Sequence, residues 1–222
     1  MTHTIAMLGG TGPQGKGLAY RFARQGHRVI LGSRNPANAE PVAVEINARV
    51  TGSDLVTVST NEAAAAAADI VVIALPYAAH AALVEQLAAT LEGKVVIDCV
   101  NPLAFDAKGP YSMEIEDRSA AEEAQRLAPG AHVVGAFHLV SAVNLWSEDE
   151  FLADEDILVC GENLEAKAVV LELAAAVSGQ PGIDVGRLRM ARYIEPLTAM
   201  IISINKKHKA HAGMRVTGLN RA

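Results

Sequence analysis

The stretch "IAMLGGTGPQGKGLAYRFA", residues 5–23, places a glycine-rich segment between an apolar run and a helix-like segment. Gly10, Gly12 and Gly15 fit the pattern G-x-G-x-x-G. Between a strand and a helix, the first glycine of this pattern makes a tight turn and the second lets backbone N–H groups approach a pyrophosphate. The third packs the helix against the strand. The helix N-terminus attracts phosphate through its dipole and free N–H groups. The stretch therefore predicts a dinucleotide-binding loop rather than a purely structural turn.

Short apolar runs alternate with helical segments over roughly the first 100 residues, as in many α/β domains. Runs such as "RVILGS" (28–33) and "KVVIDCV" (94–100) are apolar at consecutive positions, as expected of strands covered on both faces. The alanine-rich segment 62–68 predicts a short helix with Asn61 as its N-cap, because alanine is the best helix former. This order predicts an α/β fold with a Rossmann-type, doubly wound parallel sheet.

The pattern becomes less regular after Pro102. The polar stretch "AFDAKGPYSMEIEDR" (104–118) predicts a long loop, and a continuous helical segment is expected from Arg189. Further strands are expected at 132–137 and 156–161, and an amphipathic helix at 164–179. We expect a boundary near residue 150, with a Rossmann domain over 1–150 and a small C-terminal α/β extension over 151–222.

The composition limits the possible function classes. A net charge of −6 and an aromatic content of 4% argue against a nucleic-acid partner. No apolar run approaches the ~20 residues of a membrane span, and the N-terminus does not resemble a secretory signal, so we expect a cytoplasmic protein. Cys99 and Cys160 lie in apolar runs, which predicts buried free thiols. No Cys/His cluster has zinc spacing, so no metal site is expected.

The end of the second predicted strand indicates which dinucleotide binds. NAD sites usually carry Asp or Glu there, to bind the ribose 2′-hydroxyl. This strand ends in Gly32, Ser33 and Arg34, without a carboxylate. A hydroxyl and a guanidinium suit a 2′-phosphate, to which they can make charge-assisted hydrogen bonds. The sequence therefore predicts NADP, and the alternative is that Arg34 is only a surface arginine.

The sequence resembles the F420H2:NADP+ oxidoreductases, which are NADPH-dependent reductases of coenzyme F420. The resemblance begins with "LGGTGPQGKGLAYRFARQGHRVILGSR" (8–34) and continues through "DIVVIALPY" (69–77). The segments "AKGPYS" (107–112), "AFHLVSA" (136–142) and "GMRVTG" (213–218) extend it over nearly the whole chain. The N-terminal half is shared with ferric reductase domains and other NADP-binding proteins, so the middle and tail segments make the resemblance specific.

The resemblance implies that hydride passes reversibly between NADP(H) and coenzyme F420, in a homodimer. The residues that it implies for NADP are Thr11, Gly12, Pro13 and Gln14 at the pyrophosphate, Ser33 and Arg34 at the 2′-phosphate, and Leu75 and Pro76 beside the nicotinamide. Those that it implies for the deazaflavin ring are Asn101 and Ala142, with Thr217 and Gly218 in a tail that closes over the ring. The sequence departs from the family pattern at Asn38, where family members often carry a second basic residue that contacts the 2′-phosphate.

Hydride transfer between two cofactors needs no catalytic acid or base from the protein, because the cofactors carry the chemistry. His138 is therefore either a ring contact or proton relay, or a histidine satisfied by a backbone carbonyl. His80 is expected to be structural. Two alternatives remain for the whole protein. One is an NADPH-dependent reductase of another acceptor, ferric or flavin, or a small imine or carbonyl compound. The other is a non-catalytic module that senses NADP.

Overall fold

The computed structural model describes residues 2–50 and 54–219. The strands of the main sheet are β1 (Thr4–Leu8), β2 (Arg28–Ser33), β3 (Val56–Thr60), β4 (Ile70–Ile73), β5 (Val95–Asp98), β8 (His132–Gly135), β9 (Leu158–Gly161) and β10 (Ile183–Gly186), and a separate hairpin holds β6 (Leu103–Asp106) and β7 (Gly109–Ser112). The α-helices are α1 (Pro13–Arg24), α2 (Glu40–Arg49), α3 (Asn61–Ala67), α4 (His80–Leu87), α5 (Ala120–Leu127), α6 (Ala142–Leu145), α7 (Leu164–Leu173), α8 (Ala175–Ser178), α9 (Ala191–Ile194) and α10 (Leu197–His208). The 3-10 turns are η1 (Pro36–Asn38), η2 (Tyr77–Ala79) and η3 (Leu188–Met190).

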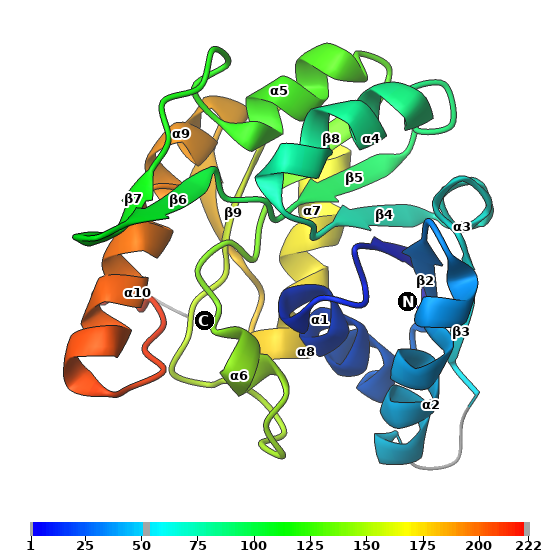
Figure 1. Ribbon diagram of the computed structural model, residues 1–222, viewed down its shortest axis with the longest axis horizontal. Helices are drawn as coiled ribbons and strands as arrows, with labels where there is room; N and C mark the ends of the chain where they lie inside the picture. The colour runs from blue at the N-terminus through cyan, green and yellow to red at the C-terminus, as the bar shows by residue number, and fades with distance from the viewer. Residues whose placement is uncertain (1, 51–53, 220–222) are drawn as a thin grey trace.

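The main sheet has the strand order β10-β9-β8-β5-β4-β1-β2-β3 (Figure 1). Its neighbouring strands run parallel except for β8 and β9, which pair antiparallel. The order β3-β2-β1-β4-β5 is that of a Rossmann fold, with the strand order reversing beside β1. The α/β fold with a doubly wound, mostly parallel sheet is thus confirmed. Strands β9 and β10, from the C-terminal part of the chain, extend the same sheet.

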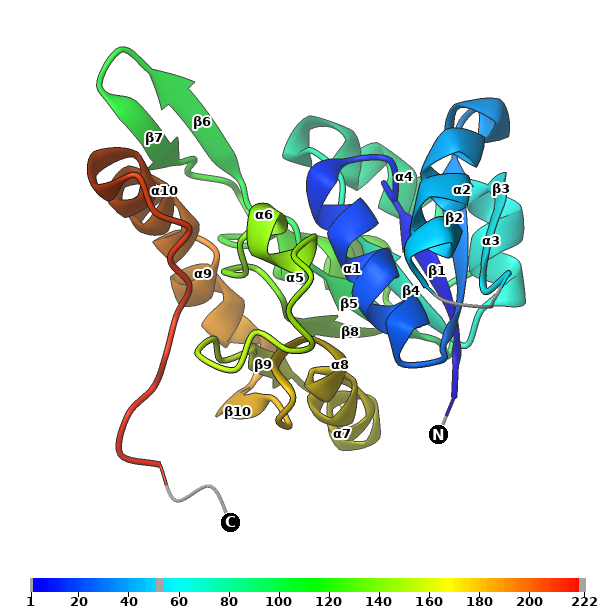
Figure 2. The same cartoon turned by 90° about the horizontal axis from the view of Figure 1, so that it is seen from below.

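Helices cover both faces of the sheet, as the apolar strands require (Figures 1 and 2). One buried cluster joins the sheet to α1, α2, α7 and α8, and another joins it to α3, α4, α5 and α9. Strand β4 is fully covered, since all four of its residues are buried. This three-layer packing places the loops after β1, β4 and β5 at one edge of the sheet, where open α/β sheets bind ligands.

Local structure departs from the sequence expectation in three places. Thr60, not Asn61, is the N-cap of α3, because its hydroxyl oxygen accepts the N–H of Ala63 at 3.2 Å. The segment expected as a long loop contains the β6–β7 hairpin, whose turn forms where Asp106 Oδ1 accepts the N–H groups of Lys108 and Gly109. The expected C-terminal helix is divided into η3, α9 and α10, with Pro196 between the last two.

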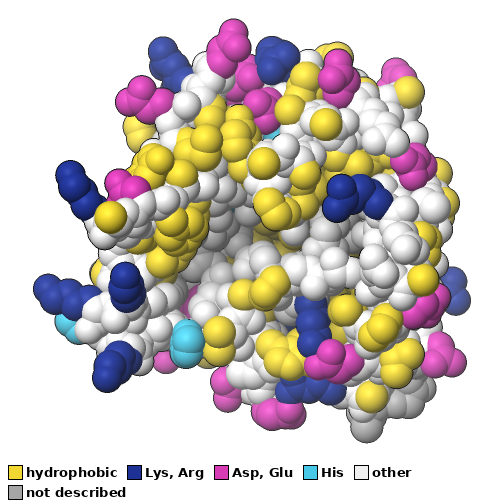
Figure 3. All heavy atoms as spheres, viewed as in Figure 1, with side chains coloured by type: hydrophobic (Ala, Val, Ile, Leu, Met, Phe, Trp, Pro, Cys, Tyr) yellow, Lys and Arg dark blue, Asp and Glu magenta, His cyan; other side chains and the backbone are white. Residues whose placement is uncertain are grey.

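The hairpin and α10 stand beside the main sheet and contact each other (Figure 2). Figure 3 shows a hollow on the face viewed in Figure 1, between this part of the protein and the part with α1 and α6. Asn101 lies just before the hairpin and Ala142 begins α6, so the predicted deazaflavin residues come from the two sides of the hollow. Within the described residues, no helix is long and apolar enough to cross a membrane.

Candidate cofactor site

The glycine loop leaves the first turn of α1 free to bind an anion. Gly12 is the N-cap of α1, and no side chain caps the helix there. The first turn holds no acidic residue, and Pro13, at its start, has no N–H to satisfy. The N–H of Gly12 itself donates to the carbonyl of Gly9 at 3.1 Å and closes the turn. The next free N–H groups therefore point out of the helix end, as a pyrophosphate requires.

Two of the glycines are needed for different reasons. A Cβ at Gly15 would lie 2.6 Å from the carbonyl oxygen of Gly9, so this position must be glycine for the loop and helix to pack. A Cβ at Gly12 would meet only that same oxygen, at 3.5 Å, which is an ordinary contact. The protein therefore does not itself require glycine at position 12. The open space beside it fits the close approach of a phosphate, and the dinucleotide pattern matches the local structure.

The loop after β2 exposes the residues expected at the 2′-phosphate. Ser33 ends the strand, and its hydroxyl donates to the carbonyl of Asn35 at 2.9 Å and accepts that residue's N–H at 3.2 Å. Arg34 is exposed and makes no ion pair with another described residue. Asn38 lies exposed at the end of η1. A guanidinium that pairs with no other residue in the described part of the chain, beside a hydroxyl at the carboxyl end of β2, is an arrangement able to bind a phosphate dianion.

The segment after β4 touches the glycine loop. Gly9 has a φ of 84°, and a Cβ there would collide with the carbonyl of Ala74 and lie 3.0 Å from Cβ of Leu75. Leu75 is half-buried and Pro76 is exposed. The structure thus brings the predicted pyrophosphate loop and the predicted nicotinamide wall together at the carboxyl ends of β1 and β4.

Asn101 and His138 meet behind the predicted deazaflavin position. The side-chain amide of Asn101 donates to the carbonyl of His138 at 3.1 Å, and the Thr198 hydroxyl donates to the same oxygen at 3.1 Å. Oδ1 of Asn101 and both ring nitrogens of His138 are buried without a hydrogen-bond partner in the described structure. Orphaned buried polar atoms are costly in a finished site, and a polar ring or a water could satisfy them here. Thr198 was not predicted as a site residue, because a single threonine in an apolar helical segment carries no sign of such a contact.

A buried charged cluster links the turns that border the hollow. Nδ1 of His80 lies 2.7 Å from Oε2 of Glu123, and its Nε2 lies 2.7 Å from Oδ2 of Asp98. The Tyr77 hydroxyl donates to Oε1 of Glu123 at 3.0 Å. Burial alone lowers the pKa of His80, but the two carboxylates outweigh it and raise the pKa to about 9. His80 is therefore a buried cation that ties the segment after β4 to the end of β5 and to α5.

Glu195 and His138 form a second buried pair with the opposite character. Burial lowers the pKa of His138 to about 4, so its imidazole is neutral near pH 7. Burial and the nearby charge of Asp98 raise the pKa of Glu195 to about 8, although the N–H groups of Ala120 and Ala121 donate to its carboxylate. His138 Nε2 and Glu195 Oε1 lie 4.0 Å apart. Both groups buried behind the expected position of the second ring are thus largely neutral near pH 7.

The end of the C-terminal tail, which carries Thr217 and Gly218, lies apart from the other candidate residues. The tail is attached where the side chain of Asn144 donates to the carbonyl of His211 at 2.7 Å, and where the N–H of Val216 donates to Asp156 Oδ2 at 2.6 Å. Thr217 and Gly218 are exposed, and the tail after α10 ends away from the hairpin and from α1 (Figure 2). The structure therefore brings together the glycine loop, Leu75, Pro76, Asn101 and the segment from His138 to Ala142, but not the tail. A closing movement of the tail stays a prediction.

The strand order, the glycine loop and the open N-terminus of α1 define a Rossmann-type dinucleotide-binding protein. The family described as coenzyme F420-dependent NADP oxidoreductase matches residues 4–102. The F420-dependent NADP reductase of Methanocaldococcus jannaschii is 38% identical, over 97% of this chain and 98% of that protein, and that of Methanothermobacter thermautotrophicus is 36% identical, over 99% and 97%. A solved structure from Arthrobacter sp. FB24, assigned as an F420-dependent NADP reductase, superposes with a TM-score of 0.80 at 29% identity, over 94% of this chain and 96% of that one. The chain belongs to the family of F420-dependent NADP reductases.

Proposed function

We propose that this protein is an oxidoreductase that transfers a hydride reversibly between NADP(H) and the deazaflavin coenzyme F420. The observation that supports this most directly is the juxtaposition of a glycine loop fit for a pyrophosphate with buried polar atoms of Asn101 and His138 that have no hydrogen-bond partner among the described residues. The relatives named for F420-dependent NADP reduction match over nearly their full length, which supports the same two cofactors. The cofactors supply the hydride chemistry, and the protein holds the two cofactors in position and excludes water from the site.

Each part of the site has a role in binding NADP. The first turn of α1, with Gly10, Thr11, Gly12 and the following N–H groups, binds the pyrophosphate. Ser33 and Arg34 bind the 2′-phosphate and select NADP over NAD. Leu75 and Pro76 then form an apolar wall for the nicotinamide, and together these contacts fix its ring at the edge of the sheet, close to the hollow.

The second ring is oriented by the opposite side of the hollow. Asn101 Oδ1 offers an acceptor, and Ala142 is small enough to allow close approach of a ring. Holding two reacting atoms within about 3–3.5 Å and excluding water are the tasks that such a site must perform. The neutral His138 lies buried behind Asn101 and supports this side of the site without placing a charge there.

We further propose that residues 151–222 complete the deazaflavin side, because Thr198 and Glu195 both reach His138. A homodimer is supported by the apolar residues exposed on the hairpin and α10, which include Phe105, Tyr111 and Met200. A cytoplasmic location is supported by the buried free thiols of Cys99 and Cys160. Sedimentation analysis of the purified protein tests the dimer.

The test of the function is direct. The purified protein is mixed with NADPH and oxidised F420, and the loss of F420 absorbance is followed, with the reverse reaction as a second arm. The proposal predicts turnover in both directions. Tight NADPH binding without F420 turnover would overturn it. Turnover with a ferric or imine acceptor instead would support a reductase of another acceptor, and binding without turnover of any acceptor would support an NADP-sensing module.

A further inference from the structure

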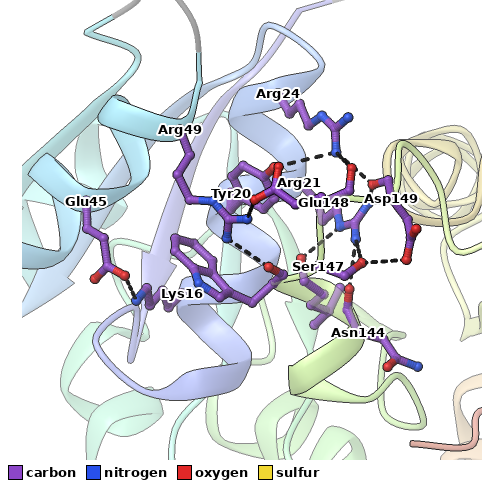
Figure 4. A network of polar contacts seen from close by, with 12 residues as sticks. Lys16, Tyr20, Arg21, Arg24, Glu45, Arg49, Asn144, Ser147, Glu148 and Asp149 are labelled. Carbon is purple, nitrogen blue, oxygen red and sulfur yellow. Dashed lines mark hydrogen bonds and ion pairs between the residues drawn. The ribbon is translucent and has the colours of Figure 1, made fainter.

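Arg21, in the middle of α1, is a buried cation whose hydrogen bonds go almost entirely to backbone carbonyls. Its residue exposure is 0%. Its Nε donates to the carbonyl of Leu145 at 2.8 Å, and Nη2 donates to that of Asn144 at 2.8 Å. Nη1 donates to the carbonyls of Asp149 at 2.7 Å and Glu150 at 3.0 Å. Figure 4 shows the guanidinium enclosed by this segment, with a further bond from Nη2 to the Ser147 hydroxyl at 3.1 Å.

The five acceptors lie in one short stretch of chain. Residues 144–150 leave the end of α6 and wrap around the guanidinium before β9. Carbonyls at a helix C-terminus have no partner within the helix, and the planar fork of an arginine can bind several of them at once. A lysine at position 21 would present a single point of charge and could not reach the same set. Arg21 therefore determines the path of this stretch.

Two neighbouring positions on the same face of α1 hold the segment just before it. Gly17 lies one turn before Arg21, and a Cβ there would lie 2.5 Å from Cβ of Leu145, so α6 packs directly on the helix backbone. Gln14 lies one turn earlier, and its amide donates to the carbonyl of Phe137 at 3.1 Å. Residues three and seven positions apart share one helix face. α1 thus contacts the chain at successive points from Phe137 to Glu150.

Phe137 shows that this contact holds an unusual backbone. Its φ is 62°, a left-handed conformation that bulky residues rarely adopt. Its ring is fully buried and packs edge to face on Phe22 of α1, with ring centroids 5.8 Å apart. Such a conformation persists only where the surroundings determine it. It directs the chain into His138 and on to Ala142.

We propose that Arg21 is a positioning residue for the second cofactor, which holds the 144–150 stretch on α1 and thereby fixes α6 and Ala142 at the edge of the hollow. This inference rests on the proposed function, because Ala142 is assigned to the deazaflavin there. The same helix presents its N-terminus to the pyrophosphate of NADP. One rigid element, α1, therefore sets the position of both cofactors.

The test compares Arg21→Lys with Arg24→Lys. Arg24 is on the same helix and donates to the same stretch, at Asp149, but from a more exposed position. Arg21→Lys is expected to raise the KM for F420 by about tenfold or more, while the Kd for NADPH stays close to that of the wild type. Arg24→Lys is expected to leave both constants close to wild type. An unchanged KM for F420 in Arg21→Lys, with the wild type active, overturns the inference.

Trp146 gives a second readout that needs no cofactor. It is the single tryptophan of the chain and lies in the 144–150 stretch. In Arg21→Lys we expect stronger quenching of its fluorescence by acrylamide than in the wild type or in Arg24→Lys. Equal quenching in all three proteins contradicts the holding role of Arg21. A wild type that reduces no F420 overturns the proposed function, and with it the cofactor role, while the quenching result still decides whether Arg21 holds this stretch.

Gly17→Ala is a second variant that tests the same inference if Arg21→Lys does not fold. Alanine favours the helix, and its methyl group pushes α6 away through Leu145. The same rise in the KM for F420 and in quenching is expected. A Gly17→Ala variant with unchanged KM and quenching also counts against the inference.

Discussion

Nε2 of His80 and Oδ2 of Asp98 lie 2.7 Å apart, and neither side chain has any exposed surface. Because Glu123 approaches the other ring nitrogen at the same distance, a cation is enclosed by two carboxylates. The three residues come from α4, β5 and α5, which lead into or away from the turns around the hollow. The pair therefore stabilises the frame of the site, and it makes that frame sensitive to pH.

We predict that the stability of the protein falls as the pH rises from about 6.5 to about 9. The pKa of His80 is about 9 in the folded protein and ~6.5 in an unfolded chain. A raised pKa contributes stability that is fully present below the unfolded value and is lost as the pH rises through the folded value. The pKa of Glu195 is also raised, from its ordinary value of 4.5 to about 8, so its contribution to stability likewise falls as the pH rises through that range. Urea unfolding at several pH values measures the effect.

His80→Gln provides the control for this dependence. It is expected to destabilise the protein by roughly 3–5 kcal/mol, because it leaves two buried carboxylates without their cation. It is also expected to flatten the pH dependence between about 8 and 9, where Glu195 contributes little. His132→Gln, at the half-buried start of β8, is the matched variant and should keep the slope of the wild type. A slope between about pH 8 and 9, above the titration of Glu195, that survives in His80→Gln contradicts the assignment.

Gly12 and Gly15 are predicted to respond differently to alanine. Gly12→Ala has room in the protein, so its thermal midpoint should stay close to wild type while the KM for NADPH rises by about tenfold or more. Gly15→Ala places a methyl group against the carbonyl of Gly9, and overpacking of this kind costs about 1–3 kcal/mol, which lowers the midpoint by several degrees. Calorimetry and NADPH titration separate the two. A Gly12→Ala variant that binds NADPH normally would argue against the pyrophosphate site.

The sequence predicted the parts of the fold that follow local patterns. The strand β2 was predicted with its observed bounds, since a buried parallel strand is a run of apolar residues. The β6–β7 hairpin was missed, because none of its strand residues is fully buried and its two strands pair only with each other. β10 was missed because four residues after a glycine- and proline-containing turn carry too weak a pattern. Its place in the sheet comes from pairing with β9, which is a long-range contact.

The candidate site divides in the same way. The glycine loop and Arg34 were predicted because their chemistry lies in adjacent residues. The cluster around His80 was not predicted, because its partners Asp98 and Glu123 are 18 and 43 positions away along the chain. The buried position of Arg21 is only weakly indicated by the sequence, where it is a charged residue on the apolar face of an amphipathic helix. Such a residue must find buried partners, but the sequence does not say that they are the carbonyls of residues 144–150.

Arg34→Ala is predicted to weaken NADP(H) selectively. Hydrogen bonds to a charged group are worth about 1.5–3 kcal/mol, so the KM for NADPH should rise by about ten- to one-hundredfold, while the KM for NADH changes little. Arg28→Ala, an exposed arginine at the opposite end of the same strand, is the matched control. Steady-state kinetics with both nucleotides measure the outcome. Equal changes for NADPH and NADH would show that Arg34 does not contact the 2′-phosphate.

Asn38→Lys is predicted to strengthen the preference for NADP. Asn38 is exposed four positions after Arg34, and its backbone N–H donates to Asn35, so a longer side chain leaves the turn intact. A second cation near the 2′-phosphate is worth up to about 1 kcal/mol at an exposed site, which lowers the KM for NADPH by about two- to fivefold at low salt. Because salt screens exposed charges, the gain should shrink at high ionic strength. Asn38→Gln controls for length, and a gain that is equal for NADH, or independent of salt, would refute the electrostatic explanation.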